Sequence, residues 1–263
     1  APLTGVAKLQ ASVTEHTLDN GWTFLIVPRE GAPVASFHTY IDVWGVFEDD
    51  GATGMAHMFE HMAFKGTPRR SARAIAEEIE SAGGEINAAT GMETTTYYAR
   101  VLKQDWALAL DILADIFTSP ELDEEELERE RDVILQEIAA AHDQPDDLVF
   151  DLAQAASFGD HPLGRSILGT QELVGAVTRQ QILDWRNRNY WGSRIVVAAA
   201  GNIDHQAFAA QAQRLLGQIE EGSGPQRETP SFLPTACTAE NGPEGCKPAS
   251  AKSRGLSVTM AKS

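Results

Sequence analysis

Residues 54–67 read GMAHMFEHMAFKGT, and the spacing of their apolar side chains predicts an α-helix that opens at Gly54. Apolar residues recur there at intervals of three and four positions: Met55, Met58, Phe59 and Met62. Residues at this spacing share one face of a helix, so we expect these side chains to lie in the core. The glycine and proline of residues 66–68 are expected to end the helix.

Two histidines and a glutamate occupy the same helix at spacings that suit a metal. His57 and His61 are four residues apart, so both imidazoles project from one face with Glu60 beside them. Two neutral imidazoles can share a zinc ion, and the carboxylate can take a proton from a water molecule that the zinc activates. The order H-x-x-E-H matches the inverzincin pattern. It predicts a hydrolytic zinc site, against the alternative of three solvated helix residues.

A catalytic zinc needs a third protein ligand, which should come from another element. Glu137 is the candidate, on a long acidic helix predicted from residue 123 to about residue 142. Glu130 lies two turns earlier on the same face, so one carboxylate can bind metal while the other makes a supporting hydrogen bond. Spacing alone leaves this assignment open. Four other acids of the helix are expected to face water: Glu124, Glu125, Glu126 and Glu128.

The rest of the chain predicts strands first, then helices, then one more strand and helix. The strands are expected at residues 22–27, 34–46, 85–102 (a strand or hairpin with a kink at Gly91) and 194–200. The further helices are expected at residues 71–81, 105–118, 146–157, 178–189 and 204–218, with a turn at 16–21 and a loop at 161–169. This order indicates an α+β fold with a mostly antiparallel sheet flanked by helices. Arg165, in the predicted loop, is expected to have a structural role.

Composition excludes several classes of protein. Of the 263 residues 43% are apolar, in proportions typical of a folded protein, and no apolar run approaches the roughly 18 residues of a membrane span. A net charge of −17 disfavours nucleic-acid binding, which needs a basic face. Residues 121–151 hold 13 acids and two arginines, a net charge of −11, so the excess is concentrated on the acidic helix and its neighbour.

The chain is expected to form one domain over residues 1–222, followed by a linker or disordered tail at 223–263. The tail holds five of the 12 prolines and shows no period of 2 or 3.6 residues. Cys237 and Cys246 lie in it, and whether they pair stays open. A start at Ala1 indicates a processed or trimmed terminus. Together with the two cysteines, it slightly favours a periplasmic or exported protein of a bacterium.

The motifs together resemble those of the insulinase-like (M16) zinc metallopeptidases, the family of the processing peptidases. The resemblance rests on residues 54–67, on ERDVI at residues 130–134 and on HPLGRSILG at residues 161–169, and it covers about residues 8–222. It implies the metal-binding N-terminal half of such an enzyme. It further implies that one zinc ion is held by His57, His61 and Glu137, that Glu60 is the general base, and that Glu130 is a supporting carboxylate.

Residues 84–90, GEINAAT, resemble the family's edge strand. In the family an extended peptide pairs with that strand, and main-chain hydrogen bonds give affinity with little demand on sequence. The resemblance therefore implies that Asn87, Ala88 and Ala89 bind substrate. Without it, an ordinary edge strand is the better interpretation.

Family enzymes pair two homologous halves, and the second half supplies an Arg and a Tyr that help to bind substrate. This chain carries the metal-binding half alone, so we expect a zinc endopeptidase that works with such a half, with a partner subunit or as a homo-oligomer. The alternative is a non-catalytic zinc-binding scaffold or partner subunit, which the intact motif disfavours. S-ribosylhomocysteine lyase shares the inverted motif, but its site cysteine has no counterpart outside the tail here.

Overall fold

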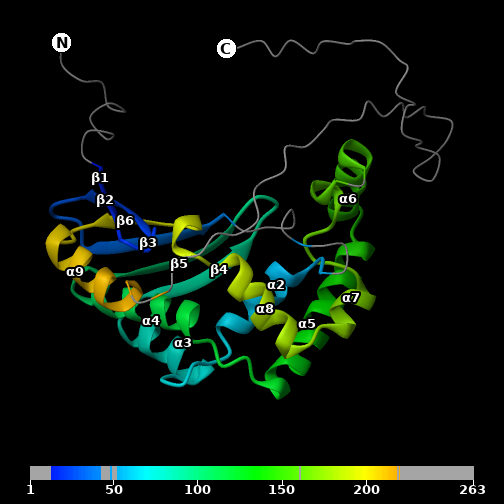
Figure 1. The fold of residues 1–263 in the computed structure, drawn as a ribbon, viewed down its shortest axis with the longest axis horizontal. Helices are drawn as coiled ribbons and strands as arrows, with labels where there is room; N and C mark the ends of the chain where they lie inside the picture. The colour runs from blue at the N-terminus through cyan, green and yellow to red at the C-terminus, as the bar shows by residue number, and fades with distance from the viewer. Residues whose placement is uncertain (1–12, 43–47, 49–51, 160, 218, 220–263) are drawn as a thin grey trace, which may run out of the picture.

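The computed structural model describes residues 13–42, 48, 52–159, 161–217 and 219, which form one sheet with helices packed against it (Figure 1). The predicted tail at 223–263 and its two cysteines lie outside these residues. Six strands make up the sheet: β1 (Thr14–Thr17), β2 (Thr23–Pro28), β3 (Val34–Ile41), β4 (Glu85–Thr90), β5 (Thr95–Leu102) and β6 (Ile195–Gly201). Their order is β1-β2-β6-β3-β5-β4; β2 and β6 run parallel, and the other neighbouring pairs are antiparallel.

The described helices surround one face and one end of this sheet. They are α2 (Met55–Ala63), α3 (Ala72–Ser81), α4 (Trp106–Thr118), α5 (Glu124–Asp143), α6 (Pro145–Phe158), α7 (Gln171–Ala176), α8 (Arg179–Asn189) and α9 (His205–Leu216). Short 3₁₀ turns lie at Lys103–Asp105, Pro162–Gly164 and Gly192–Arg194. In Figure 1, α3, α4 and α9 lie along one face of the sheet, α2 and α8 lie near the β4 edge, and α6 projects away from the body. The α+β fold with a mostly antiparallel sheet is confirmed.

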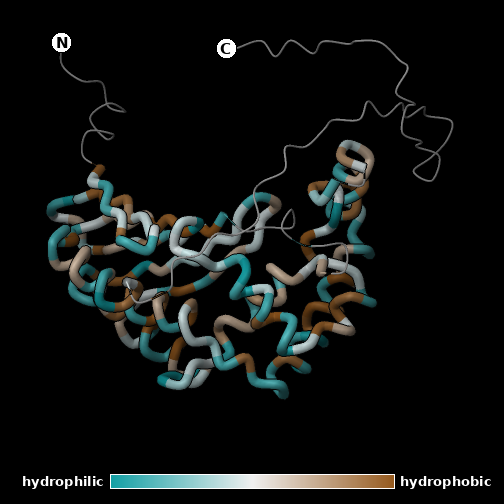
Figure 2. The backbone as a smooth tube through the Cα atoms, viewed as in Figure 1, coloured by the Kyte–Doolittle hydropathy of each residue, from teal (hydrophilic) through white to brown (hydrophobic). Residues whose placement is uncertain are grey.

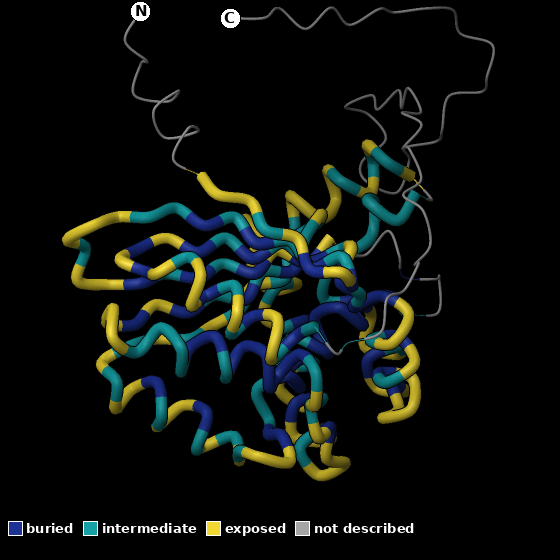
Figure 3. The backbone as a smooth tube through the Cα atoms, turned by 60° about the vertical axis from the view of Figure 1, so that its left-hand side comes forward, coloured by how far each residue is buried: buried dark blue, intermediate teal, exposed yellow. Residues whose placement is uncertain are grey.

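The two faces of the sheet differ in burial, as the pleat of alternating side chains allows. Along β3, Phe37 and Ile41 are buried on the face that meets the helices. On the opposite face the ring of His38 stacks on Tyr40 and Tyr98, with centroids 6.1 and 5.6 Å apart. Tyr40 is 43% exposed, so this second face is open among the described residues. Figure 3 shows the buried backbone concentrated between the sheet and the helices.

The core includes the apolar face of α2, as its spacing predicts. Four side chains of that face are at most 3% exposed: Met55, Met58, Phe59 and Met62. Phe59 packs its ring edge against Tyr190 at a centroid distance of 4.7 Å and also contacts the ring of Trp185 on α8. Because one side of α2 is fixed in this core, its polar side is presented in a defined direction.

Three helix starts follow from side-chain caps that the sequence carries. Ser71 Oγ accepts a hydrogen bond from the backbone N–H of Ala74 at 3.2 Å and begins α3. Asp123 Oδ1 accepts from two backbone N–H groups and begins α5. Thr178 and Gln181 form a reciprocal capping box at the start of α8. These caps satisfy backbone donors that would otherwise lack partners, so the predicted starts agree with the structure to within a residue or two.

Several sequence expectations need correction. His16 and Thr17, predicted in a turn, belong to β1, whose mostly exposed residues carry no apolar alternation and are ordered by pairing with β2. The helix α7 was not predicted, because six residues are too few for a periodic pattern. The second strand ends at Ile41, and residues 43–47 of its predicted extension lie outside the described residues. The predicted strand or hairpin at 85–102 is a hairpin, with β4 and β5 joined by a turn.

An ion network ties the segment between α2 and α3 to α4. The Arg70 guanidinium bonds to Asp111 at 2.6 Å, to Asp115 at 2.8 Å and to Glu78 at 2.9 Å. Asp115 is 3% exposed and also accepts a hydrogen bond from the Thr67 hydroxyl at 2.8 Å. A buried carboxylate needs such partners, so this network fixes the chain directly after the C-terminus of α2.

Hydrophobic residues are spread along the helices in short stretches (Figure 2). Among the described residues, no helix combines the length and the apolar character that crossing a membrane requires.

Candidate metal centre

The start of α2 is fixed by contacts from both sides. Glu48 is buried, and its carboxylate accepts hydrogen bonds from the backbone N–H groups of Gly54 at 2.9 Å and Ala56 at 2.7 Å. Burial raises the pKa of Glu48 to about 7, although these bonds and the nearby Arg165 oppose the rise. Arg165 donates to the Glu48 carbonyl oxygen at 2.8 Å, which agrees with the expected structural role. Gly54 has φ 92°, and a Cβ there would lie 2.8 Å from the Leu168 carbonyl oxygen, so glycine is required.

His57 and His61 project side by side from α2. Their Nε2 atoms are 3.2 Å apart and their rings meet edge to face, with centroids 4.6 Å apart. His57 is buried, and burial lowers its pKa to about 4, with a further contribution from the charge of His61. His57 is therefore neutral near pH 7, which is the form in which an imidazole binds a metal.

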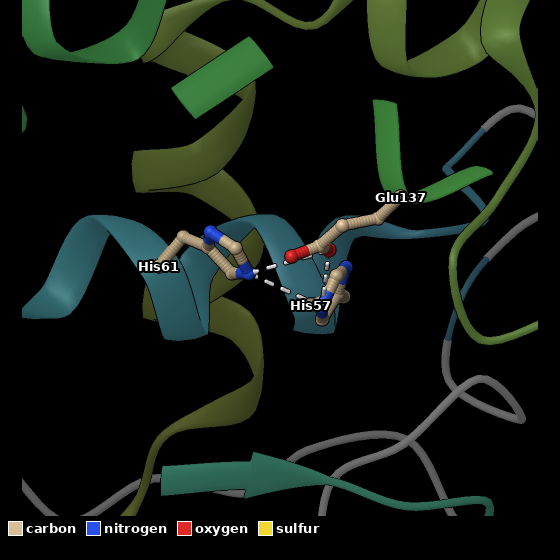
Figure 4. Close-up of side chains that lie close together, drawn as sticks. All are labelled: His57, His61 and Glu137. Atoms are coloured by element: carbon tan, nitrogen blue, oxygen red, sulfur yellow. Dashed lines mark hydrogen bonds and ion pairs between the residues drawn. The ribbon is translucent and has the colours of Figure 1, made fainter. Parts of the chain in front are cut away.

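Glu137 reaches the two imidazoles from α5, as Figure 4 shows. Its Oε2 lies 3.6 Å from His57 Nε2 and 3.8 Å from His61 Nε2. Zinc ligands about 2.0–2.1 Å from a tetrahedral ion are about 3.4 Å from one another, close to these separations. One ligand atom from each residue falls within 4.8 Å of the others, and the Glu137 side chain is 43% exposed. The donor set of two imidazoles and one carboxylate fits a zinc ion.

Glu130 lies behind His61 and is buried. Its Oε2 is 2.8 Å from His61 Nδ1, and its Oε1 is 2.5 Å from the ammonium group of Lys65. Burial alone would raise the pKa of Glu130, but the hydrogen bonds from Lys65 and His61 hold it below the ordinary value. The carboxylate is therefore ionised at neutral pH and can accept a proton from Nδ1 of His61, the tautomer in which Nε2 can bind a metal. Glu130 therefore lies within hydrogen-bond distance of the His61 ring, on the side away from Nε2.

Glu60 lies on the same helix and contacts the edge strand. The Thr90 hydroxyl, at the end of β4, donates a short hydrogen bond to Glu60 Oε2. Burial raises the pKa of Glu60, while the hydrogen bonds from Thr90 and the charge of His61 oppose the rise and the charge of Glu137 adds to it. The charges of His61 on α2 and of Glu137 on α5 therefore both act on the Glu60 carboxyl group. A raised pKa also suits a base that must accept a proton near neutral pH.

The predicted substrate-binding residues lie on β4, at the edge of the sheet beside α2. Asn87 and Ala89 are exposed and Ala88 is half-buried. The Asn87 side-chain oxygen accepts a hydrogen bond from the Ala88 backbone N–H at 2.8 Å. β4 pairs with β5 on one side and is the last strand of the described sheet on the other, and it packs against α2. Among the described residues of β4, Thr90 contacts α2 through Glu60.

Three residues of this region escaped the analysis of the sequence: Lys65, Thr90 and Glu48. Lys65 lies four residues after His61, a spacing that in a helix places both side chains on one face and could have suggested that one carboxylate contacts both. Thr90 and Glu48 carry no such signal, because their partners come from other elements. Among the acids of α5 expected to face water, Glu124, Glu125 and Glu128 are exposed and Glu126 is half-buried.

The arrangement can support hydrolysis. When bound, zinc would supply Lewis-acid polarisation of a water molecule and of a substrate carbonyl. His57, His61 and Glu137 would hold it, and Glu130 would fix the orientation of the His61 ring. Glu60 can accept the water proton at a carboxylate oxygen, and β4 can align an extended peptide beside it.

Comparisons with known proteins agree with this geometry. The family described as insulinase (peptidase family M16) matches residues 24–171, more than half of the chain. A second family, described as the peptidase M16 inactive domain, matches residues 176–247. This match extends past residue 222, where the sequence predicts the domain to end.

Curated relatives and solved structures extend the comparison. The chain is 42% identical to a probable mitochondrial-processing peptidase subunit beta of Arabidopsis thaliana over 203 residues, covering 77% of this chain and 38% of that protein. It is 41% identical over 205 residues to an uncharacterized zinc protease of Rickettsia bellii, covering 78% of this chain and 50% of that protein. A protease from Helicobacter pylori shares the fold, with a TM-score of 0.76 at 22% identity over 84% of this chain and 53% of that one.

The chain thus spans half or less of the length of these two curated relatives. The family match, the two relatives above 40% identity and the histidine–glutamate group on α2 and α5 agree with one another. The chain belongs to the insulinase family of zinc metalloproteases, peptidase family M16.

Proposed function

We propose that this chain is the metal-binding half of a zinc-dependent endopeptidase that hydrolyses peptides or unfolded polypeptides. The observation that carries the proposal is the convergence of His57, His61 and Glu137 within 4.8 Å, with Glu60 beside them. One zinc ion per chain fits this group, because the three ligand atoms surround a single point. Glu60 then acts as the general base and Glu130 as the support of His61.

The substrate is proposed to bind in an extended conformation along β4. The outer edge of this strand offers backbone groups to a peptide, and Asn87, Ala88 and Ala89 lie in its middle. Such pairing makes few demands on side chains, so it suits a range of sequences. The strand ends at Thr90, which contacts Glu60, and a peptide bound there would carry its scissile bond to the base.

A second homologous half is proposed to complete the site with an Arg and a Tyr. Two observations support it: the chain spans half or less of the two curated relatives described above, and the described sheet leaves one face open with Tyr40 43% exposed. A stabiliser of the developing oxyanion contributes about 10²–10³-fold in rate, so the isolated half should cleave poorly. A partner subunit or a second copy of this chain would serve the same purpose.

The alternative proposal is a non-catalytic zinc-binding scaffold or partner subunit. The supporting observation is again the length of the chain relative to its relatives. The contact between Glu60 and Thr90 counts against it, because a structural zinc site has no need of a base beside its ligands.

Elemental analysis and a peptide-cleavage assay test the proposal. The purified chain should contain one zinc ion, and an unstructured peptide rich in lysine and arginine should be cleaved, most rapidly with a second M16 half present. Glu60→Gln should keep the zinc and lose about 10²–10⁴-fold in rate. Glu77→Gln, an exposed helical glutamate of α3, is the matched control.

Three outcomes would contradict parts of the proposal. A wild-type protein without zinc contradicts the metal site. Equal cleavage by Glu60→Gln contradicts the base. A zinc-loaded protein that cleaves nothing, alone or with a second half, favours the scaffold.

A further inference from the structure

Thr90 contacts the proposed base through its side chain and its backbone. Its hydroxyl donates to Glu60 Oε2, and its backbone also forms a hydrogen bond to the same carboxyl group. Glu60 comes from α2 and Thr90 from the end of β4, so the contact joins two elements that pack against each other. A carboxyl group held at two points by one residue has little freedom to rotate.

The register of the sheet explains why Thr90 faces the helix. Thr90 pairs with Thr95, which is fully buried, and Ala88 pairs with Tyr97, which is also buried. Cross-strand partners share one face of a sheet, so Thr90 belongs to the face that α2 covers. Asn87 and Ala89 are exposed and alternate with this set. The hydroxyl of Thr90 is therefore directed at Glu60 by the pleat of β4.

We infer that Thr90 is a positioning residue, which holds the Glu60 carboxylate in place relative to a peptide bound along β4. This inference rests on the proposed peptidase function. The backbone of Thr90 belongs to the strand that would pair with substrate, while its side chain fixes the base. Thr90 thus sets the position of the bound peptide and of the Glu60 base relative to each other. Efficient proton transfer requires the base to be held in such a fixed position.

The role predicts a specific pattern of kinetic change. Valine has almost the shape of threonine but no hydroxyl, so Thr90→Val should leave β4 in place and free the carboxylate. A misplacement of about 1 Å can cost 10²-fold in rate, so we expect kcat to fall about 10- to 100-fold. KM and the zinc content should stay within about twofold, because neither the metal ligands nor the edge backbone change.

Two further variants separate positioning from a structural effect. Thr90→Ser keeps the hydroxyl and should restore kcat to within about threefold of the wild type. Thr14→Val places the same substitution on β1, at the opposite edge of the sheet, and should change nothing. All variants are measured as the full chain with its second half, using the same quenched-fluorescent basic peptide.

A second measurement needs no catalysis. In the metal-free protein, Thr90→Val should lower Tm by about 2–6 °C when Glu60 is present, because the hydrogen bond to the Glu60 carboxyl group is lost. In a Glu60→Ala background the same substitution should lower Tm by less than about 2 °C, because the two residues are coupled.

The outcomes distinguish the inference from the function on which it rests. Equal kcat for Thr90→Val and wild type, or equal Tm effects in both backgrounds, would overturn the inference while the peptidase function stands. A fall in kcat that Thr90→Ser does not restore would also overturn it. A wild type that never cleaves would remove the function, and the inference with it.

Discussion

Replacing Glu130 by alanine should weaken zinc binding without removing any proposed ligand. Glu130 is 7% exposed and serves two donors, with one oxygen 2.8 Å from His61 Nδ1 and the other 2.5 Å from the Lys65 ammonium. Loss of the carboxylate would free the His61 ring to rotate. It would also leave the Lys65 charge without its partner next to a cation site, and like charges repel.

The magnitude follows from these two contacts. Loss of a residue that orients a metal-binding histidine typically costs 10- to 100-fold in affinity, which corresponds to about 1.4–2.7 kcal/mol. The loss for Glu130→Ala should lie near 100-fold, because it removes both the acceptor and the charge. Glu130→Gln keeps one acceptor oxygen and should lose nearer to 10-fold.

The assay is a competition for zinc between the protein and a chelator of known affinity. Glu128→Ala is the matched control, since Glu128 lies two residues away on α5, is exposed and pairs with Arg131 at the surface. Circular dichroism of each metal-free variant checks that the helices are intact. A zinc affinity of Glu130→Ala within twofold of the wild type, with an unchanged fold, would refute the proposed support of His61.

Three further predictions concern the framework around the site. Arg70→Ala should destabilise the protein by about 3–5 kcal/mol in urea unfolding, because the buried Asp115 carboxylate loses its closest cationic partner, whereas Arg73→Ala should cost at most about 1 kcal/mol at its exposed ion pair. The folded-state pKa of Glu48, about 7, lies above its usual value of 4.5, so the wild type should lose stability as pH rises between these values. Thermal melts at pH 5 and pH 8 should show a smaller loss for Glu48→Gln, and an equal loss would contradict the assignment. Gly54→Ala should cost at least about 1–2 kcal/mol through its positive φ, whereas Gly175→Ala, with no atom within 4 Å of its Cβ, should be tolerated.

The helices with caps and long periodic faces could be predicted from the sequence. Ser71 and Asp123 identify the starts of α3 and α5 because a side-chain oxygen bonds to the backbone two or three residues later. The apolar spacing of α2 likewise predicted its buried face. Such signals lie within a few residues of one another, so they are visible in a single sequence.

The elements without a local signal needed the tertiary structure. β1 is ordered by β2, and the parallel contact of β2 with β6 joins residues more than 150 positions apart. The pairing of strands so far apart in the sequence depends on the packed fold. The residue pattern of either strand does not show which strand is its partner. The same reason applies to α7, which is short and ordered by its contact with α5.

The candidate site divides in the same way. The spacing of His57, Glu60 and His61 by itself determined that these three side chains lie close together, because a helix places residues three and four apart on one face, and it predicted two ligands and a base. Spacing left Glu130 and Glu137 interchangeable; only the packing of α5 against α2 set Glu137 near both Nε2 atoms and Glu130 behind His61.

The contacts of Lys65 with Glu130 and of Thr90 with Glu60 were likewise decided by tertiary structure. The physical reason is the range of the interactions. The sequence determines what a helix presents on its own surface, whereas the partners that orient those side chains come from elements that meet only in the packed fold.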